Sequence, residues 1–191
     1  MSDEEDDAIG VWNVETGEVH PVSAPGPARQ LLVRDDLAVV ATGSGAAERL
    51  AAVSLSGGAL RWRAEFADPE PPRPQMEGRR KLPHPMCLFG SLVIAAVATP
   101  AVVALDLWSG QEQWLTGLSG HPTALALHQG VLWFGTQDRA VTCIEPGTGT
   151  VLGVVELPEP GDHPVALAGL PGCDGILAVG SSGRVHRFDP G

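Results

Sequence analysis

Three His-Pro pairs recur at corresponding places along the chain, and their side chains are the first to consider for chemistry. They are His84-Pro85, His121-Pro122 and His163-Pro164, whereas His20-Pro21 falls outside this spacing. Imidazoles that a repeating fold brings together suit zinc, iron or copper. The alternative, which we favour, is that each histidine is held by backbone hydrogen bonds in a connecting loop. We therefore predict neither a metal site nor a cofactor.

A basic, proline-rich segment, DPEPPRPQMEGRRKLP, occupies residues 68–83. Its cations are Arg73, Arg79, Arg80 and Lys81. Long loops without structure of their own are uncommon unless they are used or disordered. The segment is thus a candidate for a partner-contacting arm or a lid, with a tolerated surface insertion as the alternative.

The sequence contains no G-x-S-x-G elbow, H-E-x-x-H pair, phosphate loop or dinucleotide fingerprint. The glycines of GSGAAE at 43–48 indicate a turn, and the absence of tyrosine removes one common general acid. His128 and His186 lie within strand-like runs and are expected to be packed or surface residues. These observations favour a protein that is not an enzyme.

The candidate residues must be positioned by a repeated unit, because one short phrase recurs along the chain. It reads VWNVETGEV at 11–19, VSLSGGALRW at 53–62, ALDLWSGQEQW at 104–114, CIEPGTGTVLG at 143–153 and RVHRFDPG at 184–191. A polar residue opens the turn in each copy, at intervals of 41, 52, 39 and 44 residues; these residues are Asn13, Ser54, Asp106, Glu145 and Asp189. A period near forty, made of short apolar runs and glycine-rich turns, is typical of β-propeller blades.

Three positions of this signature turn have a physical role. The opening acid can accept hydrogen bonds within its own turn. The glycine four residues later supplies a positive φ; this glycine is Gly17, Gly58, Gly110 or Gly149. Four residues beyond it stand Trp62 and Trp114, whose flat rings are suited to wedging between neighbouring sheets. Pro21 and Gly153 take that place in two other copies, where we expect looser seams.

The repeats predict an all-β protein with about four four-stranded antiparallel blades over residues 9–191, after an acidic disordered tail at 1–8. The fourth unit has no final strand in this sequence. Three arrangements are open: a four-bladed ring closed within one chain, a half-propeller that pairs into eight blades, and a fragment or engineered set of blades without its own function. We favour the half-propeller, because the exposed sheet edges of a lone half promote self-association.

The signature also resembles known repeats. ALDLWSGQEQW is similar to the A-x-D-x-x-x-G-x-x-x-W motif of quinoprotein-type (pyrroloquinoline-quinone-like) propellers. VWNVETGEV and GILAVGSSGRVHRFDP resemble the strand endings of WD-repeat proteins. The resemblance covers residues 8–67 and 84–191, although Ser54 replaces the aspartate in one copy and Gly153 the tryptophan in another. It implies a propeller of seven or eight blades, and we expect the fold without the quinone.

Composition excludes some partners and favours a compartment. The net charge of −11 leaves the body acidic even without the tail, so we expect no nucleic-acid or anionic-membrane partner. We see no signal peptide, and no apolar run is long enough to span a membrane. Cys87, Cys143 and Cys173 are odd in number and lack C-x-x-C spacing. They indicate buried thiols in a reducing compartment, as in the bacterial cytoplasm.

The function that we predict is a non-enzymatic binding or scaffold module. It recognises a protein or peptide on its loop face, through residues 68–83 and the three His-Pro loops, and forms a homodimer. The alternative is a small-molecule lyase or biosynthetic tailoring enzyme at the channel mouth. That enzyme would use His84, His121 and His163, with Glu159 and Asp162 nearby in the sequence.

Overall fold

The computed structural model describes residues 8–12, 19–23, 28–44, 47–67, 85–97, 99–172 and 175–189. These residues form seventeen strands and no helix, so the all-β prediction is confirmed. In this part of the chain there is accordingly no helix of the length and hydropathy that a membrane crossing needs. The basic segment at 68–83, His84, Gly17 and Cys173 lie outside the described residues, as does the tail up to residue 7.

The strands form four larger sheets and one hairpin, each sheet in plain sequential antiparallel order. The N-terminal hairpin consists of β1 (Ala8–Trp12) and β2 (Val19–Ser23). The first sheet holds β3 (Ala28–Arg34), β4 (Leu37–Ser44), β5 (Ala47–Ser54) and β6 (Leu60–Ala67). The second holds β7 (Met86–Phe89), β8 (Leu92–Ala96), β9 (Ala101–Asp106) and β10 (Glu112–Gly117). The third holds β11 (Pro122–His128), β12 (Val131–Thr136), β13 (Ala140–Ile144) and β14 (Val151–Glu156). The fourth has three described strands, β15 (Pro164–Gly169), β16 (Ile176–Gly180) and β17 (Val185–Phe188).

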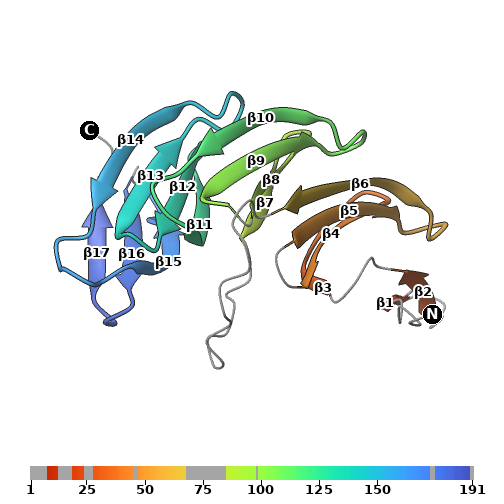
Figure 1. The fold of residues 1–191 in the computed structure, drawn as a ribbon, viewed down its shortest axis with the longest axis horizontal. Helices are drawn as coiled ribbons and strands as arrows, with labels where there is room; N and C mark the ends of the chain where they lie inside the picture. The colour runs from red at the N-terminus through yellow and green to blue at the C-terminus, as the bar shows by residue number, and fades with distance from the viewer. Residues whose placement is uncertain are drawn as a thin grey trace.

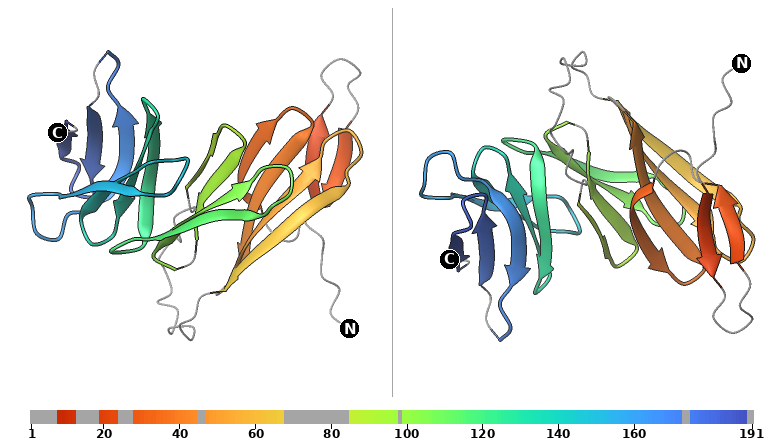
Figure 2. Two further views of the ribbon diagram at one scale, coloured as in Figure 1. Left: turned by 90° about the horizontal axis from the view of Figure 1, so that it is seen from above. Right: turned by 90° about the horizontal axis from the view of Figure 1, so that it is seen from below.

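The sheets follow one another as an open arc (Figure 1). The first strands β3, β7, β11 and β15 lie on its concave side, and the last strands β6, β10 and β14 lie on its convex side. The N-terminal hairpin and the fourth sheet stand at opposite ends of the arc, which Figure 2 shows from above and below. The described strands therefore form propeller blades in an unclosed series.

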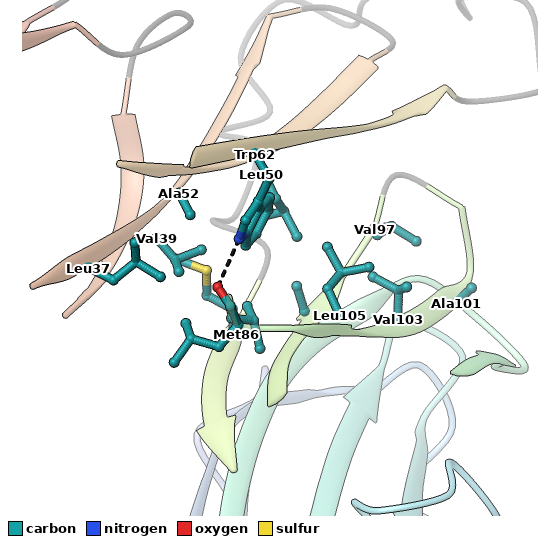
Figure 3. Close-up of a cluster of buried hydrophobic side chains, with 13 residues drawn as sticks. Leu37, Val39, Leu50, Ala52, Trp62, Met86, Val97, Ala101, Val103 and Leu105 are labelled. Carbon is teal, nitrogen blue, oxygen red and sulfur yellow. Dashed lines mark hydrogen bonds between the residues drawn. The ribbon is translucent and has the colours of Figure 1, made fainter. Parts of the chain in front are cut away.

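The apolar runs of the second sheet are continuous because both of its faces are buried. Successive strand residues point to opposite faces, so Val93 and Ala95 pack towards the first sheet while Ile94 and Ala96 pack towards the third. Figure 3 shows the core between the first and second sheets, with Trp62 standing over its middle. This core has thirteen buried residues, the next has eight, and the core between the third and fourth sheets has five among the described residues.

The signature turns have the predicted construction. The Asp106 Oδ1 atom accepts hydrogen bonds from the backbone N–H groups of Trp108 (3.1 Å) and Ser109 (2.8 Å) and from the Ser109 hydroxyl (2.7 Å). These bonds, the hydroxyl's first, lower the pKa of Asp106. Gly110 follows with a φ of 71°. Glu145 and Gly149 (φ 73°) repeat the arrangement in the third sheet.

The first sheet replaces the missing acid of its signature turn with one from a different turn. Ser54 stands where the other copies have Asp106 or Glu145, and its hydroxyl donates to Asp36 Oδ2 at 2.7 Å. Asp36 lies in the β3–β4 turn and also accepts from the Ser56 N–H at 2.7 Å and the Ser56 hydroxyl at 2.9 Å. In the second sheet the corresponding residue of the β7–β8 turn is Ser91, as the matching bonds Leu55 N–H to Asp36 O and Leu107 N–H to Ser91 O indicate. Aspartate and serine have thus exchanged places between two turns that lie side by side.

Candidate functional site

Two tryptophans close the first two seams between sheets at the convex side. The Trp62 Nε1–H donates to the Leu107 carbonyl at 2.8 Å, and the Trp114 Nε1–H donates to the Pro146 carbonyl at 3.0 Å. Each indole covers the signature glycine of the next sheet: a Cβ on Gly110 would stand 2.6 Å from the Trp62 ring. The wedge predicted for these two residues is therefore present. At the corresponding place in β14, Gly153 has no atom within 4 Å of where a Cβ would lie.

The His-Pro loops lie where the chain enters β11 and β15. His121 is exposed and His163 is half-buried. Their carbonyls accept hydrogen bonds from the Gln137 N–H (2.9 Å) and the Ser181 N–H (2.8 Å), so the backbone of each histidine fastens its loop to a neighbouring turn. Neither imidazole belongs to the one group of possible metal ligands found among the described residues. The third histidine of the predicted set, His84, is not in the described part of the chain.

That group consists of Glu159, Asp162 and His186, whose ligand atoms all lie within 4.8 Å of one another. Glu159 and Asp162 come from the β14–β15 connection, and His186 comes from β17. The His186 Nε2 atom is 3.4 Å from Glu159 Oε2 and 3.8 Å from Asp162 Oδ2. The structure thus joins the two acids of the enzyme alternative to a histidine that was expected to be a packed or surface residue.

Asp162 is buried and held by an array of donors. Its Oδ1 atom accepts from the Ser182 N–H (2.9 Å), the Ser181 hydroxyl (2.8 Å) and the His163 N–H (3.1 Å), and its Oδ2 atom accepts from the Ser182 hydroxyl (2.8 Å). The backbone N–H of Ser182 contributes most to lowering the pKa of Asp162 far below its usual range, against the opposing effect of burial. The side chain is 4% exposed, so this carboxylate is charged, fixed and largely hidden from water.

The third sheet has a corresponding contact between a carboxylate and a turn, but the carboxylate comes from the other side of the contact. There the acid is Asp138, in the β12–β13 turn, and Gly120 stands where the fourth sheet has Asp162. Burial raises the pKa of Asp138, but the hydroxyls of Thr136 and Ser119 lower it by more. A Cβ on Gly120 would lie 2.7 Å from Asp138 Oδ1, so the glycine makes room for the acid. One carboxylate fastens each turn, and either side of the contact can supply it.

In the described part of the chain, no further strand pairs with the fourth sheet beyond β17, so β17 is an edge strand. Its last described strand, β17, pairs with β16 on one side. Gly180 N–H donates to the Arg184 carbonyl at 2.8 Å, and in an antiparallel ladder the residues between such pairs direct their N–H and C=O groups outwards. Val185 is one of these residues and is 60% exposed. Open N–H and C=O groups of an edge strand are a template for another strand.

The comparisons with known proteins agree with this architecture. No curated protein matches the chain. Among solved structures, BamB from Moraxella catarrhalis superposes with a TM-score of 0.68 at 22% identity, over 91% of this chain and 50% of that one. The computationally designed protein Ika4 gives 0.66 at 16% identity, over 88% of this chain and 94% of that one. Kluyveromyces lactis Hsv2p gives 0.71 at 9% identity, over 96% and 56%. The chain spans about half the length of the BamB structure.

A family model described as outer membrane protein assembly factor BamB matches residues 3–153. The match includes the N-terminal hairpin, the first two sheets, the third sheet as far as the middle of β14, and four of the five signature turns. The predicted resemblance to quinoprotein-like propeller repeats is therefore confirmed, and the chain belongs to this family of BamB-like propeller repeat proteins.

Proposed function

We propose that the chain is a protein-binding propeller module, and that its binding site is the open edge of β17. The observation that carries this proposal is that the fourth sheet has three described strands, whereas each of the other three large sheets has four. An added strand would complete the sheet through main-chain hydrogen bonds, a common mode of protein recognition. The description of the family as an assembly factor supports a role in binding other proteins.

The partner strand comes from the N-terminal hairpin of a second copy. The hairpin carries the same signature phrase as β9–β10 and β13–β14, so β1 and β2 correspond to the third and fourth strands of a blade. β17 is likewise the third strand of its blade. The position beside it is that of a fourth strand, which β2 could occupy. A two-stranded sheet alone is at best marginally stable in water, so the hairpin is stabilised when β2 joins the larger fourth sheet.

The arc makes this pairing intermolecular. The hairpin and the fourth sheet stand at its two ends in all three views (Figures 1 and 2). Two copies arranged head to tail would join each hairpin to the other copy's fourth sheet. The interface would be repeated by a twofold axis, which is the most common symmetry of homo-oligomers.

Light scattering on a sizing column tests the proposal directly. We expect a mass near 40 kDa, twice the 19.9 kDa of one chain. Two variants should reduce it to the mass of a single chain: removal of residues 1–23, which deletes the hairpin, and Val185→Pro, which removes an N–H from the open edge. Val185→Thr is the matched control, because it keeps that N–H, and it should remain a dimer.

Mixing the two defective variants sharpens the test. The truncated chain keeps an intact β17 and Val185→Pro keeps an intact hairpin, so together they can form one of the two junctions. A mixed dimer should therefore appear when neither variant dimerises alone. A wild-type chain that is a single copy at all concentrations, or a Val185→Pro chain that still dimerises, would disprove strand addition by a second copy.

The segment at 68–83 remains a proposed arm for a further protein partner on the loop face. Its cations give it a charge opposite to that of the acidic body. Deletion of 68–83 should leave the dimer mass unchanged, which separates this role from that of the β17 edge. The melting temperature should stay within a few degrees, as for surface loops in general.

A further inference from the structure

Glu159 and His186 each hold one polar atom in an unfavourable position. Glu159 Oε2 and His186 Nε2 are hidden from solvent and have no hydrogen-bond partner. A buried polar atom without a partner is unfavourable, because it has lost its hydrogen bonds to water and gained none in the protein. The two atoms are 3.4 Å apart, and the Oδ2 atom of Asp162 lies 3.8 Å from His186 Nε2.

The spacing of the three atoms suits a metal ion. Tetrahedral bonds of about 2.0–2.2 Å place neighbouring donor atoms about 3.4 Å apart. The separation of His186 Nε2 from Glu159 Oε2 equals this value, that from Asp162 Oδ2 is 3.8 Å, and all three donor atoms lie within 4.8 Å of one another. An imidazole nitrogen with two carboxylate oxygens suits divalent transition metals better than calcium or magnesium, which prefer oxygen alone.

Neighbouring side chains already orient two of the three ligands. Ser181 and Ser182 fix the carboxylate of Asp162 and leave its Oδ2 atom with one accepted hydrogen bond, so a lone pair stays available. Arg184 donates to Glu159 Oε1 at 2.7 Å and thereby turns Oε2 towards His186. Such outer partners hold metal ligands in place and contribute to affinity. The guanidinium repels a cation, but its side chain is 62% exposed and the charge is therefore screened by water.

We propose that Glu159, Asp162 and His186 form a binding site for a divalent transition-metal ion. Of the common ions, Zn²⁺ should bind most tightly after Cu²⁺. The site has three protein donors and leaves the remaining coordination position to water or to an added donor. It belongs to the fourth sheet: the corresponding residues around the third are Gly117, Gly120 and Thr142, which supply neither carboxylate nor imidazole. The inference does not rest on strand addition at β17.

Isothermal titration calorimetry on the purified chain, first with ZnCl₂ and then with MnCl₂ and MgCl₂, tests the site. We expect one Zn²⁺ per chain, weaker binding of Mn²⁺ and none of Mg²⁺. His186→Ala and Glu159→Gln should each weaken Zn²⁺ binding by about 100-fold or more, beyond the 10–100-fold typical of outer partners. His121→Ala is the matched control, because it removes an exposed imidazole from the same kind of loop, and it should bind Zn²⁺ as the wild type does.

Cobalt gives an independent readout. Co²⁺ bound through one nitrogen and two oxygens should produce visible absorption bands that His186→Ala loses, while far-ultraviolet circular dichroism shows that the variant is folded. Zn²⁺ should also raise the melting temperature of the wild type and not that of His186→Ala. The proposal is overturned if the folded wild type binds no Zn²⁺ up to about 1 mM, or if His186→Ala and Glu159→Gln bind it with unchanged affinity.

Discussion

The first and second sheets are in contact on both sides of the arc, whereas the third and fourth sheets lack the convex-side contact of an indole. The first seam is closed twice. On the concave side Gln30 and Met86 exchange two hydrogen bonds, at 3.2 and 3.1 Å, and on the convex side Trp62 binds the Leu107 carbonyl. The third seam is closed on the concave side, where the Thr123 hydroxyl donates to the Pro164 carbonyl. On its convex side β14 offers Gly153 in place of an indole.

This difference explains how the core changes along the chain. Beside Gly153, Val155 remains 41% exposed, and on the opposite face of β14 Leu152 and Val154 are 57% and 56% exposed. Each indole ties its strand to the turn of the next sheet, a contact that β14 lacks at Gly153. The fourth sheet is held by a smaller apolar core of five buried residues and by the polar contacts of Asp162. Its hydrogen exchange should therefore be faster than that of the second sheet.

Removal of an indole should have the largest effect. Trp62→Ala deletes a ring that is 8% exposed and leaves both a cavity and an unpaired Leu107 carbonyl. Such changes cost about 3–5 kcal/mol in the free energy of unfolding, measured by urea denaturation with circular dichroism. Trp108→Ala is the matched control: that ring is 54% exposed and its loss should cost less than about 0.5 kcal/mol. Equal losses in the two variants would contradict the wedge.

The glycine under the indole should come next. Gly110→Ala places a Cβ 2.6 Å from the Trp62 ring at a residue with φ of 71°, so both overpacking and backbone strain oppose it. We expect a loss of about 2–5 kcal/mol, the sum of typical values for the two effects. Gly130→Ala has a similar φ of 76° but open space around it, and should lose the strain part alone. If both variants lose the same amount, the indole does not press on Gly110.

Repeat spacing was sufficient to predict the sheets, the signature acids, the glycines and the two tryptophan wedges, because these depend on residues within one turn or on neighbouring repeats. It could not reveal Asp36, which acts for Ser54 from a turn eighteen residues earlier. For the same reason it could not place His186 beside Glu159 and Asp162, which are more than twenty residues away in the sequence. A comparison of the repeats position by position contains the missing signal. His186 and Asp162 of the fourth repeat correspond to Thr142 and Gly120 of the third. The predictions for 68–83 and His84 are not tested by the described residues.

At the seam between the third and fourth sheets, a glycine-to-alanine substitution should stabilise the protein instead of destabilising it. Gly153→Ala meets no atom within 4 Å, and an alanine in a strand loses less backbone entropy on folding than a glycine. We expect the free energy of unfolding to rise by about 0.5–1 kcal/mol. The comparison with Gly110→Ala then sets two glycines of one repeated unit against each other. A loss of stability in Gly153→Ala would mean that the convex side of this seam is filled, and the contrast between the seams would fail.

The smallest expected effect is on the stability of the protein at low pH. Hydrogen bonds, led by the Ser54 hydroxyl at Asp36 and the Ser109 hydroxyl at Asp106, lower the pKa of both carboxyls from the ordinary value of 3.8. A carboxyl with a lowered pKa in the folded state contributes stability above its unfolded pKa and loses it as pH falls through the folded pKa. Urea midpoints should therefore fall below about pH 4, and Asp36→Asn and Asp106→Asn should each reduce that pH dependence by a similar amount. Asp35→Asn is the control, because asparagine tolerates its φ of 51°. Equal losses of pH dependence in the two variants would show that an acid in the β3–β4 turn stabilises the first sheet's signature turn as well as an acid within the turn does. A loss in Asp106→Asn alone would show that Asp36 does not stabilise the first sheet's signature turn.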